Sequence, residues 1–105
     1  HQHAYCRLKF ALTEDTPTIK PYDESRWAEL LDARTGDIDP SLRLLEGLHA
    51  RWTALAASLT EAEWQRGFFH PEANETIPLW RSFPYYAWHA RHHTAQILWR
   101  REHLG

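Results

Sequence analysis

The stretch from Leu42 to Leu59 constrains the fold of this chain more than any other feature of its sequence. An apolar side chain returns there at steps of three or four residues, which is the spacing of one helix face packed in a bundle. Asp39 suits the N-cap position ahead of this face, and Pro40 suits the first helical position. The sequence therefore predicts a long helix from Asp39, in an all-α fold, with a bundle seam formed by Leu42, Leu45, Leu48, Trp52, Leu55 and Leu59.

A second helix is predicted at the start of the chain. It should end near residues 13–15, because a residue before proline favours extended backbone and Thr16-Pro17 and Lys20-Pro21 follow closely. When each residue turns by about 100°, one narrow face of this helix carries His1, Tyr5, Leu8 and Leu12.

Shorter elements are expected around the long helix. An extended loop follows residue 15, contains a short helical piece at SRWAELLDA and stops at Gly36. Thr60 and Glu63 have the spacing of a capping box, which predicts one short helical turn. Aromatic and β-branched residues around a Pro- and Asn-containing bend in residues 66–79 predict a small two-stranded β-hairpin.

The last helix is expected to begin or to kink at Pro84, which lacks a backbone donor. From residue 86 onward it has two apolar stripes on nearly opposite sides. A helix that is apolar on both sides in a chain of 105 residues suggests packing against a second copy, so we expect a homodimer. The first stripe holds Tyr86, Ala90, His93 and Ile97 with His89 at its edge, and the second holds Trp88, Ala95 and Trp99.

Size and charge limit the class of protein. The chain fits one domain, residues 1–105, and its net charge of −2 with no basic run gives no footprint for nucleic acid. No segment approaches a membrane span or a signal peptide, and the single Cys6 excludes an internal disulfide, so we expect a cytoplasmic protein. We expect Cys6 to be a packed or half-exposed thiol with no catalytic role.

Two histidines four residues apart, His89 and His93, can direct their ring nitrogens to a common point. They lie on the first stripe of the last helix, where the ring nitrogens of buried imidazoles need a hydrogen-bond partner or a metal ion. His1 shares the interior face of the first helix and is the candidate third ligand. Three imidazoles and a water form an open tetrahedral site of the catalytic type, in which a metal lowers the pKa of a bound water or thiol.

Other interpretations of the histidines stay open. His1 could belong to a purification tag or to a frayed terminus, since the chain does not start with methionine. His49, beside the leucine seam, is expected to be a core histidine bonded to backbone rather than a partner of a ligand. No Glu follows His89 in an H-E-x-x-H arrangement, which argues against a helix-borne general base. Surface or loop positions are expected for His3, His70, His92 and His103.

Three stretches resemble the YfiT/BstA group of the DinB superfamily: RLKFALTEDTPTIKPYDESRWAELLDA, LLEGLHARW and YYAWHARHH. The resemblance covers nearly the whole chain. It implies an up-down-down-up four-helix bundle that holds zinc or nickel through three histidines, and the ligand positions of the family fall on His1, His89 and His93. His1 would then be native, and the chain would be N-terminally incomplete, lacking the family's first helix. Departures from the family pattern occur at Pro78, Trp80, Pro84 and Gln96.

The family is described as metal-dependent hydrolases and, for some members, bacillithiol S-transferases. The resemblance therefore implies an enzyme in which the divalent metal activates water or a low-molecular-weight thiol against a small-molecule substrate, with no nucleic acid or membrane as a partner. Two alternatives remain on the sequence alone. One is a bundle in which the metal only holds helices together, and the other is a helical dimerisation module formed through Trp88 and Trp99.

Overall fold

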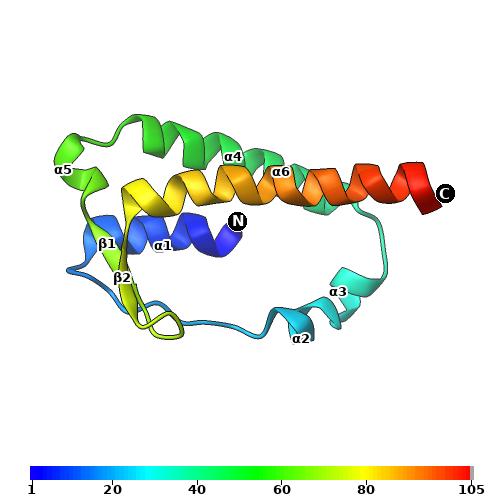
Figure 1. Cartoon of the computed structure of the whole chain (residues 1–105), viewed down its shortest axis with the longest axis horizontal. Helices are drawn as coiled ribbons and strands as arrows, with labels where there is room; N and C mark the ends of the chain where they lie inside the picture. The colour runs from blue at the N-terminus through cyan, green and yellow to red at the C-terminus, as the bar shows by residue number, and fades with distance from the viewer. Residues whose placement is uncertain (105) are drawn as a thin grey trace.

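The computed structural model describes residues 1–104 and consists of three long helices with a small hairpin at one end (Figure 1). Short helices interrupt the connections between the long ones. In chain order the elements are α1 (Gln2–Thr13), α2 (Glu24–Ala28), α3 (Leu31–Arg34), α4 (Asp39–Ala57), α5 (Glu61–Trp64), β1 (Gly67–His70), β2 (Glu75–Pro78) and α6 (Leu79–Leu104).

The long helices lie side by side with a fixed order of directions. α1 and α4 are parallel and both run toward the hairpin end, and α6 is antiparallel to them and runs away from it (Figure 1). Two parallel helices in sequence need a long connection, and residues 14–38, with α2 and α3, make it. Down, down and up are the directions that the second, third and fourth helices have in an up-down-down-up bundle.

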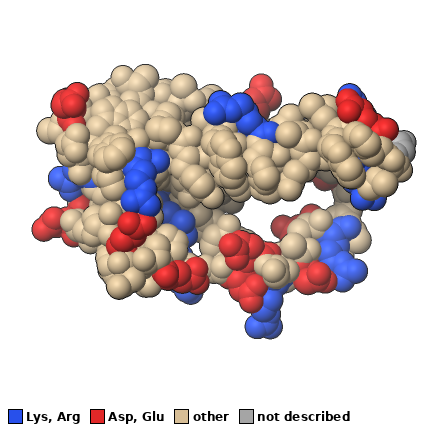
Figure 2. Space-filling model, in the orientation of Figure 1, with Lys and Arg blue, Asp and Glu red and all other residues tan. Residues whose placement is uncertain are grey.

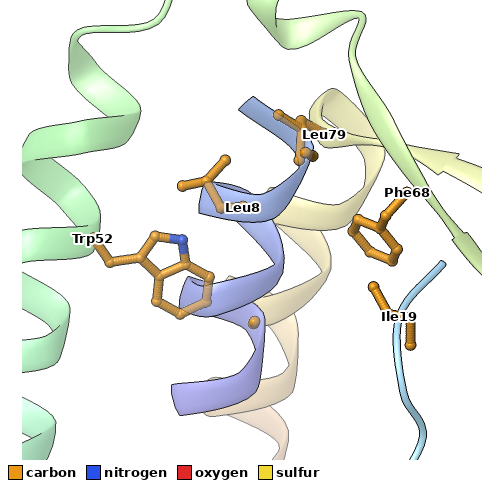
Figure 3. Packing of buried hydrophobic residues seen from close by; sticks show 7 residues of the cluster. Leu8, Ile19, Trp52, Phe68 and Leu79 are labelled. Carbon is orange, nitrogen blue, oxygen red and sulfur yellow. The ribbon is translucent and has the colours of Figure 1, made fainter. Parts of the chain in front are cut away.

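The core lies where the hairpin packs over α1 and the start of α6. Phe68 and Ile19 face each other there, Trp52 reaches α1 from α4, and Leu79 is 2% exposed (Figure 3). Small residues of α1, such as Ala11, let these large side chains approach the helix closely. The core therefore fixes α1, α4 and α6 at the hairpin end of the molecule.

The C-terminal end of α1 is satisfied by a side chain from the hairpin region. The last four carbonyls of a helix lack intrahelical partners, and Arg66 donates from Nε to the Ala11 carbonyl at 2.7 Å and from a terminal nitrogen to the Glu14 carbonyl at 2.8 Å. The prediction that this helix ends near residues 13–15 is confirmed. The expectation of extended backbone at Thr16 is wrong, because its φ is +42°.

The seam of α4 is buried along only part of its length. Trp52 is 6% exposed and Leu55 and Leu59 pack against the core, whereas Leu42 and Leu45 are 52% and 41% exposed. Figure 2 shows an opening between the C-terminal half of α6 and the α2–α3 segment. The bundle prediction therefore holds at the hairpin end, and no described residue covers the other end of the seam.

The helix caps were predicted with mixed success. The capping box of α5 is confirmed, with reciprocal hydrogen bonds between Thr60 and Glu63. Asp39 does not cap α4: it is the first helical residue, and its backbone N–H donates to the carboxylate of Asp37 at 3.0 Å. Pro40 lies in the first turn as expected. The short helical piece is present but broken into α2 and α3.

The hairpin is confirmed in the expected segment, with β1 antiparallel to β2 and Gly67 opposite Pro78. A side chain at Gly67 would collide with the Ile77 carbonyl, so this position requires glycine. The loop after α1 joins the hairpin as well, because Ile19 N–H donates to the Phe69 carbonyl at 3.0 Å. This contact holds the long connection against the core.

α6 begins at Leu79, five residues before Pro84, so of the two alternatives the start of the helix at the proline is wrong, and a kink at Pro84 stays a prediction. Pro84 lies in the second turn and costs one hydrogen bond, to the Trp80 carbonyl. The second apolar stripe is solvent-exposed, with Trp88 and Trp99 at 51% and 55%. Within residues 1–104, every helix is too short or too polar to cross a bilayer.

Candidate metal centre

His1, immediately before α1, lies against the other two long helices. Its ring meets Trp52 of α4 and Tyr86 of α6 edge-on, with ring centroids 5.6 Å apart in each case. Its ring centroid is also 5.7 Å from that of His89. The first residue of the chain therefore approaches the histidine pair of α6, as the antiparallel packing of α1 against α6 predicts.

The two histidines of α6 point their ring nitrogens toward each other. The Nε2 atoms of His89 and His93 are 3.0 Å apart. Gln96 Oε1 accepts from Nδ1 of His93 at 2.8 Å, and a neutral imidazole with its proton on Nδ1 has a lone pair on Nε2. Gln96 thus leaves His93 Nε2 as an acceptor or a metal ligand, which is the role of residues behind the ligands in metal sites.

His89 is the more enclosed member of the pair. Its Nδ1 is buried without a hydrogen-bond partner, and its Nε2 donates to Nε2 of His93 at 3.0 Å, so His93 sets the tautomer of this ring. Burial lowers the pKa of His89, and the nearby His93 lowers it further. A cation bound between the two Nε2 atoms would take the place of this proton, and His89 would then carry its proton on Nδ1.

The prediction that His93 belongs to a buried stripe is wrong, because His93 is exposed and Ile97, one turn later, is 69% exposed. Tyr86 and Ala90 of the same stripe are half-buried. The stripe is therefore covered only near the start of α6, and the pair lies where coverage ends, with one ring enclosed and one ring open to solvent.

His49 has a different role from the one expected. It is exposed on α4 rather than buried in the core, and its Nε2 lies 2.8 Å from Nδ1 of His1. The interpretation as a core histidine bonded to backbone is wrong. Since one of these two nitrogens must carry the proton, His49 holds the ring of His1 through its side chain.

The geometry partly fits a metal ion. Two imidazoles on one tetrahedral zinc, with Zn–N bonds of about 2.0–2.1 Å, have ring centroids about 5 Å apart, close to the 4.5 Å of His89–His93 and the 5.7 Å of His1–His89. However, no three His, Cys, Asp or Glu side chains within residues 1–104 already surround a common point. The two Nε2 atoms of the pair would have to move apart slightly to hold an ion, and the contact of His1 with His49 uses Nδ1, which leaves Nε2 of His1 as the atom that would bind it.

The remaining histidines lie away from the three candidates. His3 is half-buried and stacks on Tyr22 with centroids 4.1 Å apart, so the expectation of a plain surface residue is wrong. His92 and His103 are exposed and stack on neighbouring tryptophans of α6, and half-buried His70 lies at the end of β1. Cys6 is a free thiol and is exposed, so the expectation of a packed or half-exposed thiol is wrong.

A cavity of ≈ 660 Å³ opens beside His1 and His89. Its walls come from α1, the connection before α2, the hairpin and the first half of α6. Phe68 and Tyr86 supply apolar surface, and burial raises the pKa of the Tyr86 hydroxyl. The volume is that of a site for a small molecule. Sequence reasoning found the histidines but not this cavity, whose walls come from segments far apart in the chain.

Three comparisons relate this arrangement to known proteins. A family model described as the DinB superfamily matches residues 1–97. The chain is 50% identical over 97 residues to the "Putative metal-dependent hydrolase YfiT" of Bacillus subtilis, covering 92% of this chain and 54% of the relative. It is also 50% identical over 103 residues to a "Putative metal-dependent hydrolase" of Geobacillus thermodenitrificans, covering 98% and 58%.

The fold is shared with a solved structure. YfiT from Bacillus subtilis, described as "a probable metal-dependent hydrolase with an unusual four-helix bundle topology", superposes with a TM-score of 0.93 at 48% identity, over 97% of this chain and 59% of that one. The prediction of an all-α, DinB-like four-helix-bundle fold is confirmed. The chain spans little more than half the length of these relatives. With nearly all of its residues matched by the family model, the chain belongs to the DinB superfamily.

Proposed function

We propose that this chain carries the metal site of an enzyme acting on a small molecule, with His1, His89 and His93 as ligands of one divalent ion, zinc or nickel. The observation that carries the proposal is the approach of imidazoles from opposite ends of the chain, with the ring centroids of His1 and His89 5.7 Å apart and the Nε2 atoms of His89 and His93 3.0 Å apart. The names of the relatives, which describe metal-dependent hydrolases, support the same class of protein.

A divalent ion in such a site supplies a Lewis acid that lowers the pKa of water or a thiol toward neutrality. The residues of the chain prepare the ligands. Gln96 holds the proton of His93 on Nδ1, and the lowered pKa of His89 keeps that ring neutral near pH 7. Trp52 and Tyr86 contact the His1 ring edge-on and limit its position.

Hydrolysis is the reaction that we propose, and transfer of a low-molecular-weight thiol such as bacillithiol to an electrophile is the alternative. Both need a substrate beside the ligands, and the ≈ 660 Å³ cavity next to His1 and His89 offers that space. Ala90 follows His89 where H-E-x-x-H enzymes carry their general base. The proposal therefore assigns binding and positioning roles to the named residues, and it assigns no general base.

We also propose that the protein acts as a homodimer. Trp88 and Trp99, three turns apart on one side of α6, are each more than half exposed. Exposed aromatic surface of this kind marks interaction sites in soluble proteins, and a two-fold dimer buries the same surface of both copies. Sedimentation of the native protein with and without a chelator measures this state, and a monomer in both conditions would contradict it.

The metal site is tested by metal analysis of the purified protein and two variants. Wild type should hold about one ion per chain, as expected for a three-histidine site, and His93→Ala should lose it. His92→Ala is the matched control, because His92 lies on the same helix but stacks on Trp88 with centroids 5.0 Å apart. Equal metal content in both variants would refute the assignment.

Activity separates the reaction classes. The metal-loaded protein is assayed against model esters and amides in water, and against model electrophiles with bacillithiol. Turnover that disappears with chelator and with His93→Ala supports the enzyme, and the substrate that turns over identifies hydrolysis or thiol transfer. Loss of stability on chelation without any turnover would instead support an ion that only holds the helices together.

A further inference from the structure

Arg7 is a cation without an anion inside the cavity beside the histidines. It lies on α1, is half-buried and lines the cavity together with His1 and His89. Within residues 1–104 it forms no ion pair. Its guanidinium donates to the Lys20 carbonyl at 3.5 Å, the outer limit of a hydrogen bond, and also lies within hydrogen-bonding reach of the Tyr86 hydroxyl. A guanidinium has five N–H donors, so most of the binding capacity of Arg7 is unused.

The other charges on the cavity wall do not neutralise Arg7. Arg81 is held by Glu75 through two hydrogen bonds of 2.7 and 3.1 Å, so that pair carries no net charge. Glu24 and Glu72 also line the cavity, but both are exposed and neither comes within ion-pairing distance of Arg7. Among the described residues, Arg7 is therefore the guanidinium of this cavity wall that has no carboxylate partner.

Apolar surface lines the same cavity as Arg7 and two of the proposed metal ligands, His1 and His89. Six residues of helix place Arg7 about 9 Å along the α1 axis from His1. Tyr86, whose hydroxyl is close enough to Arg7 to be affected by its charge, and Phe68 line the cavity as well. A ligand that fills the cavity would meet imidazole rings, aromatic surface and a guanidinium in its wall.

We propose that Arg7 binds the acidic group of the substrate, so that the substrate class is a small molecule with a carboxylate or phosphate at one end and an apolar body. Carboxylate and phosphate match the planar donors of arginine and form paired, charge-assisted hydrogen bonds. The proposal rests on the proposed function in taking the cavity as the substrate site, and it assigns Arg7 to substrate binding rather than to the chemical step.

The test measures binding by calorimetry, with and without metal. The probes are phenylacetate, its neutral analogue phenylacetamide, and inorganic phosphate as a competitor. Wild type should bind phenylacetate more tightly than phenylacetamide, and Arg7→Gln should weaken phenylacetate binding by about 10- to 100-fold, the range for hydrogen bonds to charged groups, while phenylacetamide binding stays unchanged. Displacement by phosphate would add phosphate esters to the substrate class, and its failure would restrict the class to carboxylates.

Lys9→Gln is the matched control, because it removes the same charge from α1 at a residue whose ammonium lies over the Tyr5 ring and outside the cavity. Arg7→Lys is the second variant: it keeps the charge and loses the paired donors, and its affinity should be intermediate. Phenylacetate binding that is absent in wild type, unchanged in Arg7→Gln or equally weakened in Lys9→Gln would overturn the proposal.

The same experiment separates this inference from the proposed function. A protein that holds no metal but binds phenylacetate through Arg7 would refute the metal site and support the anion site. A protein that loses its metal in His93→Ala but binds phenylacetate equally well as wild type and as Arg7→Gln would support the metal site and overturn the anion site.

Discussion

Replacing Arg66 by methionine tests how the fold fixes the helix that begins beside His1. The Arg66 Nε bond of 2.7 Å goes to the carbonyl of Ala11, a residue that is 0% exposed. Methionine keeps the aliphatic cover over this carbonyl and removes the donor. A buried polar group that loses its partner costs about 1–3 kcal/mol, so Arg66→Met should lower the free energy of unfolding by about 2 kcal/mol.

Urea denaturation followed by tryptophan fluorescence measures this change, and in a domain of this size it corresponds to a fall in Tm on the order of 10 °C. Arg34→Met is the control, because Arg34 forms only a surface ion pair with Glu29, with side chains 63% and 71% exposed. Such pairs contribute about 0–1 kcal/mol. If Arg66→Met cost no more than Arg34→Met, the guanidinium would not hold the end of α1, and the reasoning would be refuted.

Three further predictions concern the core, a helix cap and the metal ligands. Leu79→Ala should lower the free energy of unfolding by about 2–5 kcal/mol in urea, since Leu79 is 2% exposed; a loss under about 1 kcal/mol would contradict its place in the core. Hydrogen bonds from Thr60 lower the pKa of Glu63, so its contribution is present above the unfolded pKa and lost as pH falls through the lower folded value; an acid-unfolding curve unchanged in Glu63→Gln would count against this. Gln96→Leu should weaken metal binding about 10- to 100-fold, measured by competition with a chelator, because His93 loses the acceptor at 2.8 Å; unchanged affinity would show that Gln96 does not position the ligand.

Local sequence signals predicted local structure well. The capping box at Thr60 and Glu63 and the hairpin depend on neighbours within a few residues, and each is found where expected. The end of the first helix is also found where expected, although the distant Arg66 binds its last carbonyls. The predictions that failed concern distant neighbours, the exact residue at a helix end or the backbone angle of a single residue. At the start of α4, the carboxylate of Asp37 accepts a hydrogen bond from the backbone N–H of Asp39, which was the predicted cap. Thr16 has a positive φ although a proline follows it.

The exposure of His93 shows why helical periodicity alone cannot define a core. Periodicity gives the direction of a side chain around its helix, but burial also needs a neighbouring element at the same height. α1 has 12 residues and α6 has 26, so at 1.5 Å per residue they are about 18 Å and 39 Å long. His1 at the start of α1 lies beside His89, and the part of α6 that continues past it extends beyond α1. His93 and Ile97 lie on that part.

Gln96 illustrates how a departure from a family pattern can keep the physical role of the position. Position 96 is one of the departures from the family pattern and lies three residues after His93 on α6. The structure places Gln96 Oε1 2.8 Å from Nδ1 of His93, and an amide oxygen can only accept, so His93 must carry its proton on Nδ1. A histidine at the same position offers either a donor or an acceptor. Glutamine therefore specifies the tautomer of His93 with Nε2 free more strictly than histidine would.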